Sequence, residues 1–178
     1  MRLLSNDIKK TKPRLCKVDS QYLKYLHHFD NRISVKFNNR PFVVLVIEIN
    51  GFLYTLPLTS QTTSERMNRG KKKRSHRTTT FIYDRKQEIA NLLHNNMFPV
   101  YEALLTDIII DPVTMSYEEN EERFIRKNWV DINQKSIDVY LDRYDEKCRD
   151  FQFLSKICCD FKYLESKCID WKNQHQII

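Results

Sequence analysis

The chain has 178 residues, of which 41% are hydrophobic and 30% charged, and its formal net charge is +7. This length suffices for one domain with a substantial core and is short for two, so we expect a single domain over residues 1–178. No apolar run approaches the roughly 20 residues that a membrane-spanning helix requires, and no apolar segment follows the basic start MRLLSNDIKKTKPR. The composition argues against a helical membrane protein and a secretory signal, and it predicts a cytoplasmic protein without a membrane partner.

The charge is distributed unevenly along the chain. Residues 1–100 carry 19 Lys and Arg against 7 Asp and Glu, a net charge of +12, whereas residues 101–178 carry 11 against 16, a net charge of −5. A strongly basic half favours a polyanionic partner. RNA or DNA is favoured over an anionic lipid surface, because no basic amphipathic helix accompanies the charge.

The first predicted elements are an irregular start and a short helix. Residues 1–18 are basic and aperiodic and are interrupted by Pro13, which is typical of an arm or an irregular strand. From Asp19 onward, DSQYLKYLHHFD places its apolar residues three and four positions apart behind an Asp-Ser cap. This spacing predicts an amphipathic helix.

Two β-rich runs follow, PFVVLVIEI at 41–49 and FLYTLPL at 52–58, and Asn50-Gly51 joins them. A two-residue turn of this kind requires positive φ at both central positions, so Asn-Gly predicts a β-hairpin. The first run is apolar almost throughout. We therefore expect it to be a central strand covered on both faces.

The middle of the chain combines a polar stretch with further strands. Residues 60–80, SQTTSERMNRGKKKRSHRTTT, are polar and rich in cations, and a mobile basic loop is expected there. Strand character resumes at 78–83. The next segment, KQEIANLLHNNMFPV, fits a helical turn by its spacing and a strand by its length, and the pattern leaves both open.

The last third is expected to be mainly helical, over residues 116–172. Ser116 and Glu119 have the S-x-x-E form of a capping box before apolar residues at helical spacing, and QKSIDVYLDRYDEKC predicts a further helix. Apolar residues from Phe151 to Trp171 then predict one long amphipathic helix. The order of elements indicates an α+β fold with a compact twisted antiparallel β-sheet core flanked by helices.

Several kinds of enzyme site are absent from the sequence. Gly51 and Gly70 are the only glycines, which excludes a glycine-rich phosphate loop, and neither HExxH nor GxSxG occurs. The acidic run at 118–122 is explained by the dipole at a helix N-terminus. Five cysteines without a CxxC pair indicate reduced, mostly buried thiols. We expect no metal and no cofactor.

A metal-free reaction on a polyanion remains open. The 2′-hydroxyl of RNA can attack the adjacent phosphate, so a protein needs only to orient the strand, stabilise charge and assist proton transfer. Thr59 and Ser60 end the second strand of the hairpin, and Arg40, preceded by Lys36, comes just before the first. Antiparallel pairing predicts that Arg40 lies near Thr59 and Ser60. A solvated strand end beside a surface arginine would show the same pattern.

At this point the sequence resembles a known family. YLKYLHHFDNRI followed by RPFVVLVIEINGFLYTLPLTS is similar to the N-terminal signature of the ToxN/AbiQ family of endoribonuclease toxins, which belong to type III toxin–antitoxin and phage abortive-infection systems. NNMFPV at 95–100 and ERFIRKNWVDINQKSIDVY also resemble family segments. The resemblance covers about residues 20–145, and its four motifs occur in the family's order.

The resemblance implies a MazF-like toxin architecture and metal-independent cleavage of single-stranded RNA that leaves 2′,3′-cyclic phosphate ends. It implies a repeated pseudoknot RNA as antitoxin and partner, cellular or phage RNA as substrate, and it allows an RNA-bridged toxin oligomer. By position, Thr59, Ser60 and Tyr22 match family active-site residues, Ser60 foremost. Arg40 stands where the family has a lysine, and so does Thr62, which leaves the proton-transfer residue open.

Lys36 is a candidate for RNA binding, and the basic tract RGKKKRSHR adds Arg69, Lys71, Lys72, Lys73, Arg74, His76 and Arg77. Histidine is the side-chain type whose reference pKa suits proton transfer at neutral pH, so His76 could replace the family lysine. The alternative is that the tract only binds phosphates. A non-catalytic RNA- or DNA-binding protein that uses the same basic half is the rival hypothesis for the whole chain.

Overall fold

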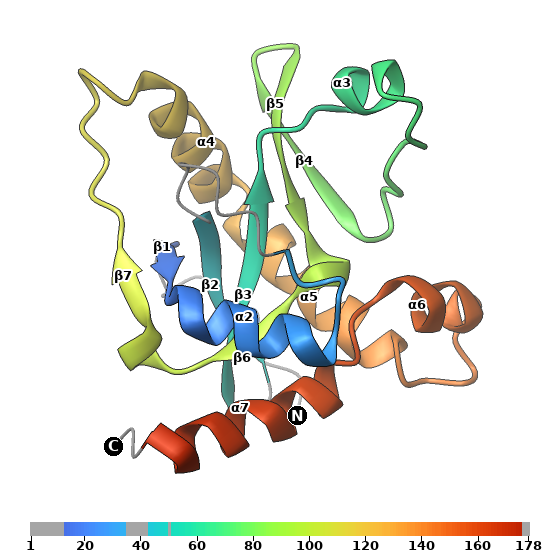
Figure 1. Cartoon of the computed structure of the whole chain (residues 1–178). Coiled ribbons are helices and arrows are strands. Elements are labelled where there is room, and N and C mark those ends of the chain that lie inside the picture. Colours follow the sequence, from blue (N-terminus) through green and yellow to red (C-terminus); the bar gives the residue numbers. More distant parts are fainter. Residues whose placement is uncertain (1–12, 35–42, 50, 176–178) are drawn as a thin grey trace.

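The computed structural model describes residues 13–34, 43–49 and 51–175. Within them, the chain forms a curled antiparallel sheet with helices packed around it (Figure 1). The strands are β1 (Leu15–Val18), β2 (Val43–Ile49), β3 (Phe52–Thr59), β4 (Thr79–Asp84), β5 (Gln87–Leu93), β6 (Phe98–Val100) and β7 (Leu105–Asp107). The helices are α2 (Ser20–Phe29), α3 (Thr63–Asn68), α4 (Ser116–Lys127), α5 (Trp129–Asp142), α6 (Phe151–Ile157) and α7 (Phe161–His175), with 3₁₀ turns at His94–Asn96 and Glu102–Leu104. The expected α+β class is confirmed.

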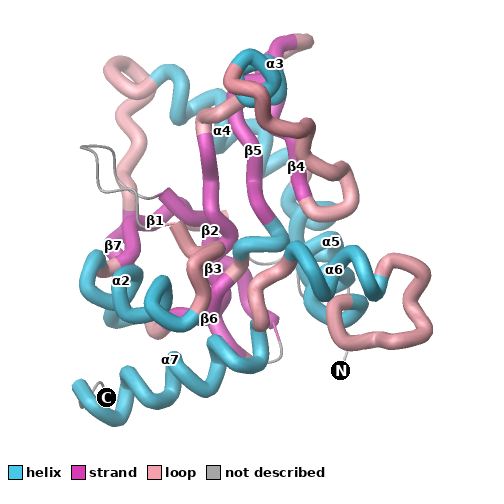
Figure 2. Tube along the Cα trace, turned by 45° about the vertical axis from the view of Figure 1, so that its right-hand side comes forward, coloured by secondary structure: helices cyan, strands magenta, loops and turns pink. Residues whose placement is uncertain are grey.

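The strand order is β4-β5-β3-β2-β1-β7, and β6 also pairs with β3. Strand β3 joins the two parts of the sheet, since its first half pairs with β6 and its end pairs with β5. Figure 2 shows the β4-β5 hairpin at one end of β3 and β6 near α7 at the other. The end of β3 therefore lies at the junction between the two parts of the sheet.

The predicted hairpin is confirmed. Ile49 pairs with Phe52 across a two-residue turn, and Gly51 has φ of 80°. Strand β2 lies between β3 and β1, and its neighbouring residues Val46 and Ile47, which point to opposite faces, are both buried. The continuous apolar run thus forms an interior strand covered on both sides, as expected.

The predicted helix after Asp19 is also confirmed. The Asp19 side chain accepts hydrogen bonds from the backbone N–H groups of Gln21 and Tyr22 and caps α2. Tyr22 is fully buried, its hydroxyl donates to the carbonyl of Pro99 at 2.7 Å, and its ring meets Trp171 edge to face at 5.5 Å. Helix α2 is thereby fixed against α7 and the end of β6.

The ambiguous segment 86–100 forms two strands, β5 and β6, with the 3₁₀ turn His94–Asn96 between them. Residues 87–93 form β5, which pairs with β4 along its length and with the end of β3. Pairing with β4 along the strand and with the end of β3 at Asn91 and Leu92 gives its backbone hydrogen-bond partners, so tertiary contacts rather than local spacing select the strand.

Three local predictions are wrong. The stretch 60–80 was expected to be a loop throughout, but residues 63–68 form α3, because Thr62 and Glu65 make a reciprocal capping box. Ser116 is the first residue of α4 and not its cap, since the N-cap residue is Met115 and no side chain caps this helix. The further helix predicted over QKSIDVYLDRYDEKC starts earlier and ends earlier than expected, since α4 ends at Lys127 and α5 runs from Trp129 to Asp142.

The long helix predicted from 151 to 171 is two helices. The chain is extended at Cys158, and the Cys159 N–H donates to the carbonyl of Asn95 at 2.9 Å. The Asp160 N–H donates to the Asp30 carboxylate at 3.3 Å. These bonds to distant residues take the place of intrahelical ones, and helix α7 starts anew after them.

The cysteines are free thiols, four of them buried, as predicted. Among the described residues no group of three or more His, Cys, Asp or Glu side chains could hold a metal ion. None of the helices in the described part of the chain has the length and apolar character needed to cross a bilayer.

Candidate functional site

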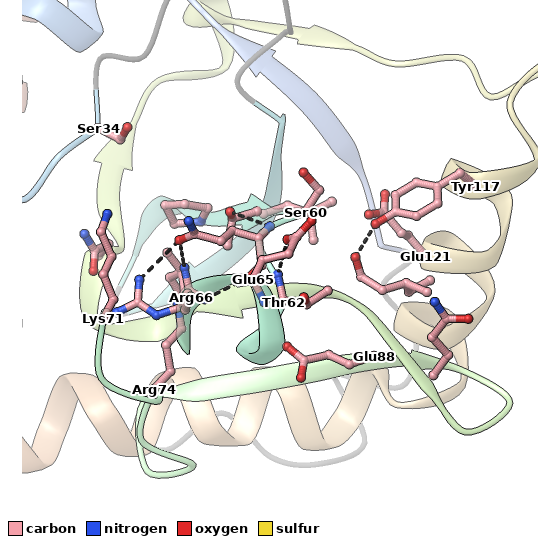
Figure 3. Close-up of a pocket in the computed structure, with 18 of the residues that line it drawn as sticks. Ser34, Ser60, Thr62, Glu65, Arg66, Lys71, Arg74, Glu88, Tyr117 and Glu121 are labelled. Atoms are coloured by element: carbon pink, nitrogen blue, oxygen red, sulfur yellow. Dashed lines mark hydrogen bonds between the residues drawn. The ribbon is translucent and has the colours of Figure 1, made fainter. Parts of the chain in front are cut away.

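A cleft of about 1040 Å³ opens at the end of β3. Most of its lining comes from the end of β3, helix α3 with the loop after it, strand β5, and the first turns of α4, and Ser34 and Asn96 complete it (Figure 3). Its polar and charged lining residues include Thr59, Ser60, Gln61, Thr62, Glu65, Arg66, Lys71, Arg74, Glu88, Tyr117, Glu118 and Glu121. Segments far apart in the sequence thus meet around the Thr59-Ser60 pair.

Thr59 and Ser60 lie where β3 leaves the sheet. Thr59 is the last residue of β3 and pairs with Asn91 of β5. The Thr59 Oγ1 atom accepts the N–H of Gln61 at 3.2 Å, whereas Ser60 is exposed to the cleft. The threonine side chain stabilises the turn, and the serine hydroxyl faces solvent where a ligand would lie.

The backbone after Ser60 is held from two sides. The Gln61 carbonyl accepts hydrogen bonds from Asn91 Nδ2 and from Arg74 Nη1, both at 2.9 Å. Asn91 is fully buried and also donates to Glu88 Oε1 at 3.0 Å, and Glu88 accepts the Thr63 N–H at 2.7 Å. These bonds fix the path of the chain on which Ser60 sits.

Two guanidinium groups on the α3 side lack a carboxylate partner. Arg66 donates to the Lys72 carbonyl at 3.1–3.2 Å and to Gln61 Oε1 at 3.3 Å. Arg74 contacts the same Gln61, and neither arginine forms an ion pair within the part of the chain that the structure describes. Burial and the nearby Arg66 lower the pKa of Arg74 to about 10. The positive charge on this side, with Lys71, is free to bind an anion such as a phosphate.

The α4 side of the cleft is acidic. Glu118 and Glu121 lie one helical turn apart on α4, and Glu88 lies nearby on β5. Glu121 is only 5% exposed, and no hydrogen bond or ion pair joins its carboxyl group to any described residue. Burial, and secondarily the charge of Glu118, raise the pKa of Glu121 to about 7.

The structure brings together four of the predicted site residues, which are Thr59, Ser60, Lys71 and Arg74. Thr62, which stands at a position where a lysine was expected by resemblance, caps α3, and its hydroxyl accepts the Glu65 N–H at 3.3 Å. Its side chain therefore has a structural role here.

Other predicted residues lie away from the cleft. Tyr22 is buried under α7 and contributes to the core, so its predicted catalytic role is not supported by its position. Arg77 forms ion pairs with Asp142 and, at 3.1 Å, with Asp150. His76 packs against Phe81 in a tilted arrangement, with 4.6 Å between ring centres, and does not line the cleft.

The remaining predicted cations divide into two groups. Arg69, Lys72 and Lys73 are exposed and do not line the cleft. Lys36 and Arg40 lie outside the described residues, so the expected contact between Arg40 and the Thr59-Ser60 pair stays a prediction.

Sequence reasoning missed Arg66, Asn91 and Glu121. The Thr62-x-x-Glu65 capping pattern could have located α3 and thus the side on which Arg66 lies. No local signal marks Asn91 or Glu121, because their importance comes from pairing between strands and from the packing of α4 against β4.

The chain matches the family model described as toxin ToxN of the type III toxin–antitoxin system over residues 14–168. It is 30% identical over 143 residues to the endoribonuclease ToxN of Bacillus thuringiensis subsp. kurstaki. The aligned region covers 75% of this chain and 70% of that protein. It is 29% identical over 141 residues to the endoribonuclease AbiQ of Lactococcus lactis subsp. lactis. The aligned region covers 75% of this chain and 77% of that protein.

The fold of this chain is similar to solved structures of type III toxins. One comes from work on selective toxin inhibition by a non-coding RNA pseudoknot in type III systems. It superposes with a TM-score of 0.78 at 26% identity and covers 91% of this chain and 99% of that one. A second, AbiQ, a lactococcal anti-phage endoribonuclease, shares the fold with a TM-score of 0.78 at 23% identity and covers 92% of this chain and 99% of that one.

Proposed function

The chain belongs to the ToxN family of endoribonuclease toxins of type III toxin–antitoxin systems, and we propose that it cleaves single-stranded RNA in the cleft beside Ser60 without a metal ion. The observation that carries this assignment is the pair Arg66 and Arg74. These guanidinium groups lack carboxylate partners among the described residues and line the same cleft as Thr59 and Ser60. Cations kept free of ion pairs beside an exposed hydroxyl suit a phosphodiester substrate.

In the proposed reaction the nucleophile belongs to the RNA. The 2′-oxygen attacks the adjacent phosphorus, the bond from phosphorus to the 5′-oxygen breaks, and the products carry a 2′,3′-cyclic phosphate and a 5′-hydroxyl. One proton leaves the 2′-hydroxyl and one is delivered to the departing 5′-oxygen. Arg66, Arg74 and Lys71 stabilise the charge on the phosphoryl oxygens, and Ser60 orients the phosphate by hydrogen bonding.

The same cleft gives a route for inhibition. A solved relative is a toxin inhibited by a non-coding RNA pseudoknot. We propose that a repeated pseudoknot RNA inhibits this chain in the same way, with part of the RNA seated on the Arg66 and Arg74 side. Free toxin would then act on cellular or phage RNA in the cytoplasm.

The test uses purified protein and RNA in EDTA. Wild type is expected to produce cyclic-phosphate ends, and Ser60→Ala should lower the cleavage rate at least about 100-fold, because a group that contacts the reacting phosphate is lost. RNA affinity should change less than about threefold, since the cations remain. Ser64→Ala, on the exposed side of α3, is the matched control and should cleave normally.

Intact RNA at high protein excess would contradict the metal-free mechanism and return the chain to the rival class of non-catalytic nucleic-acid-binding proteins. Unchanged cleavage by Ser60→Ala would leave the activity in place and remove it from this cleft.

A further inference from the structure

The two sides of the cleft differ in charge. Figure 3 shows Lys71, Arg66 and Arg74 on one side of Ser60, and Tyr117 and Glu121 on the other. A strand of RNA bound between them presents phosphates and bases in different directions. The charge fixes which goes where, because the carboxylates of α4 repel phosphates and the guanidinium groups of the α3 side attract them.

Glu121 is the buried carboxylate of the acidic side. Its side chain lines the cleft, is nearly inaccessible to solvent, and has no partner among the described residues. The charged groups that share the cleft are Glu65, Glu88 and Glu118, which cannot pair with it when ionised, and the cations Arg66, Lys71 and Arg74. A buried carboxylate without a partner is unfavourable in the free protein. A ligand that donates hydrogen bonds to it would relieve this.

A nucleobase meets that requirement. The exocyclic amino groups of adenine, cytosine and guanine donate hydrogen bonds and carry no charge, and carboxylates accept from them in known modes of base recognition. Uracil lacks an amino group, and its N3–H lies between two carbonyl oxygens that a carboxylate repels. The cleft volume of about 1040 Å³ leaves space for such a base beside the phosphate.

Building on the proposed function, we propose that the α4 side of the cleft is a nucleobase subsite in which the Glu121 carboxylate accepts hydrogen bonds from an amino-bearing base next to the scissile phosphate. Glu118 adds negative potential on the same face of α4. The subsite sets sequence preference, while the Arg66 and Arg74 side binds every sequence alike.

The experiment treats a random-sequence RNA pool with the protein at pH 8 in EDTA and sequences the cleaved ends. This pH lies above the pKa of Glu121, so that the carboxyl group is ionised. For wild type we expect depletion of uracil at one position flanking the cut. Glu121→Gln, which replaces a pure acceptor by an amide of the same size, should reduce that depletion about tenfold. Glu119→Gln, on the same helix but away from the cleft, is the matched control and should keep the wild-type profile.

Lys71→Ala tests the phosphate-binding side of the cleft in the same experiment. It should slow cleavage of all sequences by a similar factor, because it removes a phosphate contact. An unchanged base profile in Glu121→Gln would overturn the subsite. So would a uniform loss of rate across all sequences, which would indicate proton transfer by Glu121. Absence of cleaved ends with wild type would instead contradict the proposed function, so the two failures are distinguishable.

Discussion

The charged residues of the cleft differ from Arg77, which lies outside it, in whether they form ion pairs. In the cleft, Arg66, Arg74 and Glu121 have no ion-pair partner within the described chain. Where β4 meets α5 and α6, Arg77 is paired with both Asp142 and Asp150. Arg74 and Arg77 are three positions apart in one basic tract, yet the first is available to a ligand and the second is committed to the fold.

This difference indicates where the molecule gives up stability for binding. Unpaired, partly buried charges are unfavourable in the free protein and gain from a ligand, whereas paired charges hold elements together. Substitutions in the cleft should therefore impair function with little loss of stability, and substitutions in the paired region should do the reverse.

The largest effect is expected for Arg74→Ala. Loss of a charge-assisted contact to phosphate should lower RNA affinity about tenfold or more, and the slope of log affinity against log salt should become shallower by about one. The melting temperature should change little, because Asn91 still holds the Gln61 carbonyl. Titration of labelled RNA over a range of salt concentrations measures both quantities. Arg69→Ala, outside the cleft, is the control, and an equal loss in both variants would show that the tract binds RNA only diffusely.

Glu121→Gln should stabilise the protein in alkaline solution. The folded-state pKa of about 7 lies above the ordinary 4.5, so the stability that Glu121 contributes is fully present below about pH 4.5 and is lost as the pH rises to about 7. Gln removes the buried charge, and the free energy of unfolding at pH 8 should rise by about 1–3 kcal/mol. Urea unfolding of both proteins at pH 4.5 and pH 8 measures this. A gain of equal size at both pH values would contradict the ionisation argument.

Arg77→Ala should have the opposite character. It leaves two half-buried carboxylates without their common partner, and the free energy of unfolding should fall by about 1–2 kcal/mol while RNA affinity stays within about twofold. Urea unfolding and RNA titration at pH 7 test this. Arg123→Ala removes only an exposed pair on α4 and should cost less than about 0.5 kcal/mol. A large loss of RNA affinity in Arg77→Ala would place Arg77 with the ligand-binding charges.

The smallest effect is expected for the double variant Lys72→Ala, Lys73→Ala. Both residues are exposed and lie outside the cleft lining, so they should add only long-range attraction. RNA affinity should fall about two- to fivefold at low salt, and the difference should vanish at high salt, because exposed charges are screened. A loss as large as that of Arg74→Ala would remove the distinction between cleft and surface cations.

Local interactions encoded in the sequence determined helix α2, the β2–β3 hairpin and the interior position of β2. Asp19 caps α2 through the N–H groups of Gln21 and Tyr22, and Ile49 pairs with Phe52 across the two-residue turn that the Asn-Gly sequence predicts, so both elements follow from residues close together in the chain. The apolar run of β2 likewise required an interior strand. The sequence lacks metal-binding and glycine-loop motifs and has two hydroxyl residues at a strand end, Thr59 and Ser60, and both line the cleft.

Tertiary structure decided what neighbouring residues cannot specify. Helices α6 and α7 separate because Cys159 and Asp160 bond to Asn95 and Asp30, residues far away in the sequence. Arg74 and Arg77 differ because the turn before β4 places Arg77 beside Asp142 and Asp150, while Gln61 holds Arg74 at the cleft. A pattern of residues fixes local hydrogen bonding and burial. The partner that a charged side chain meets depends on which distant elements the fold brings beside it, and this sets the roles of Arg74 and Glu121.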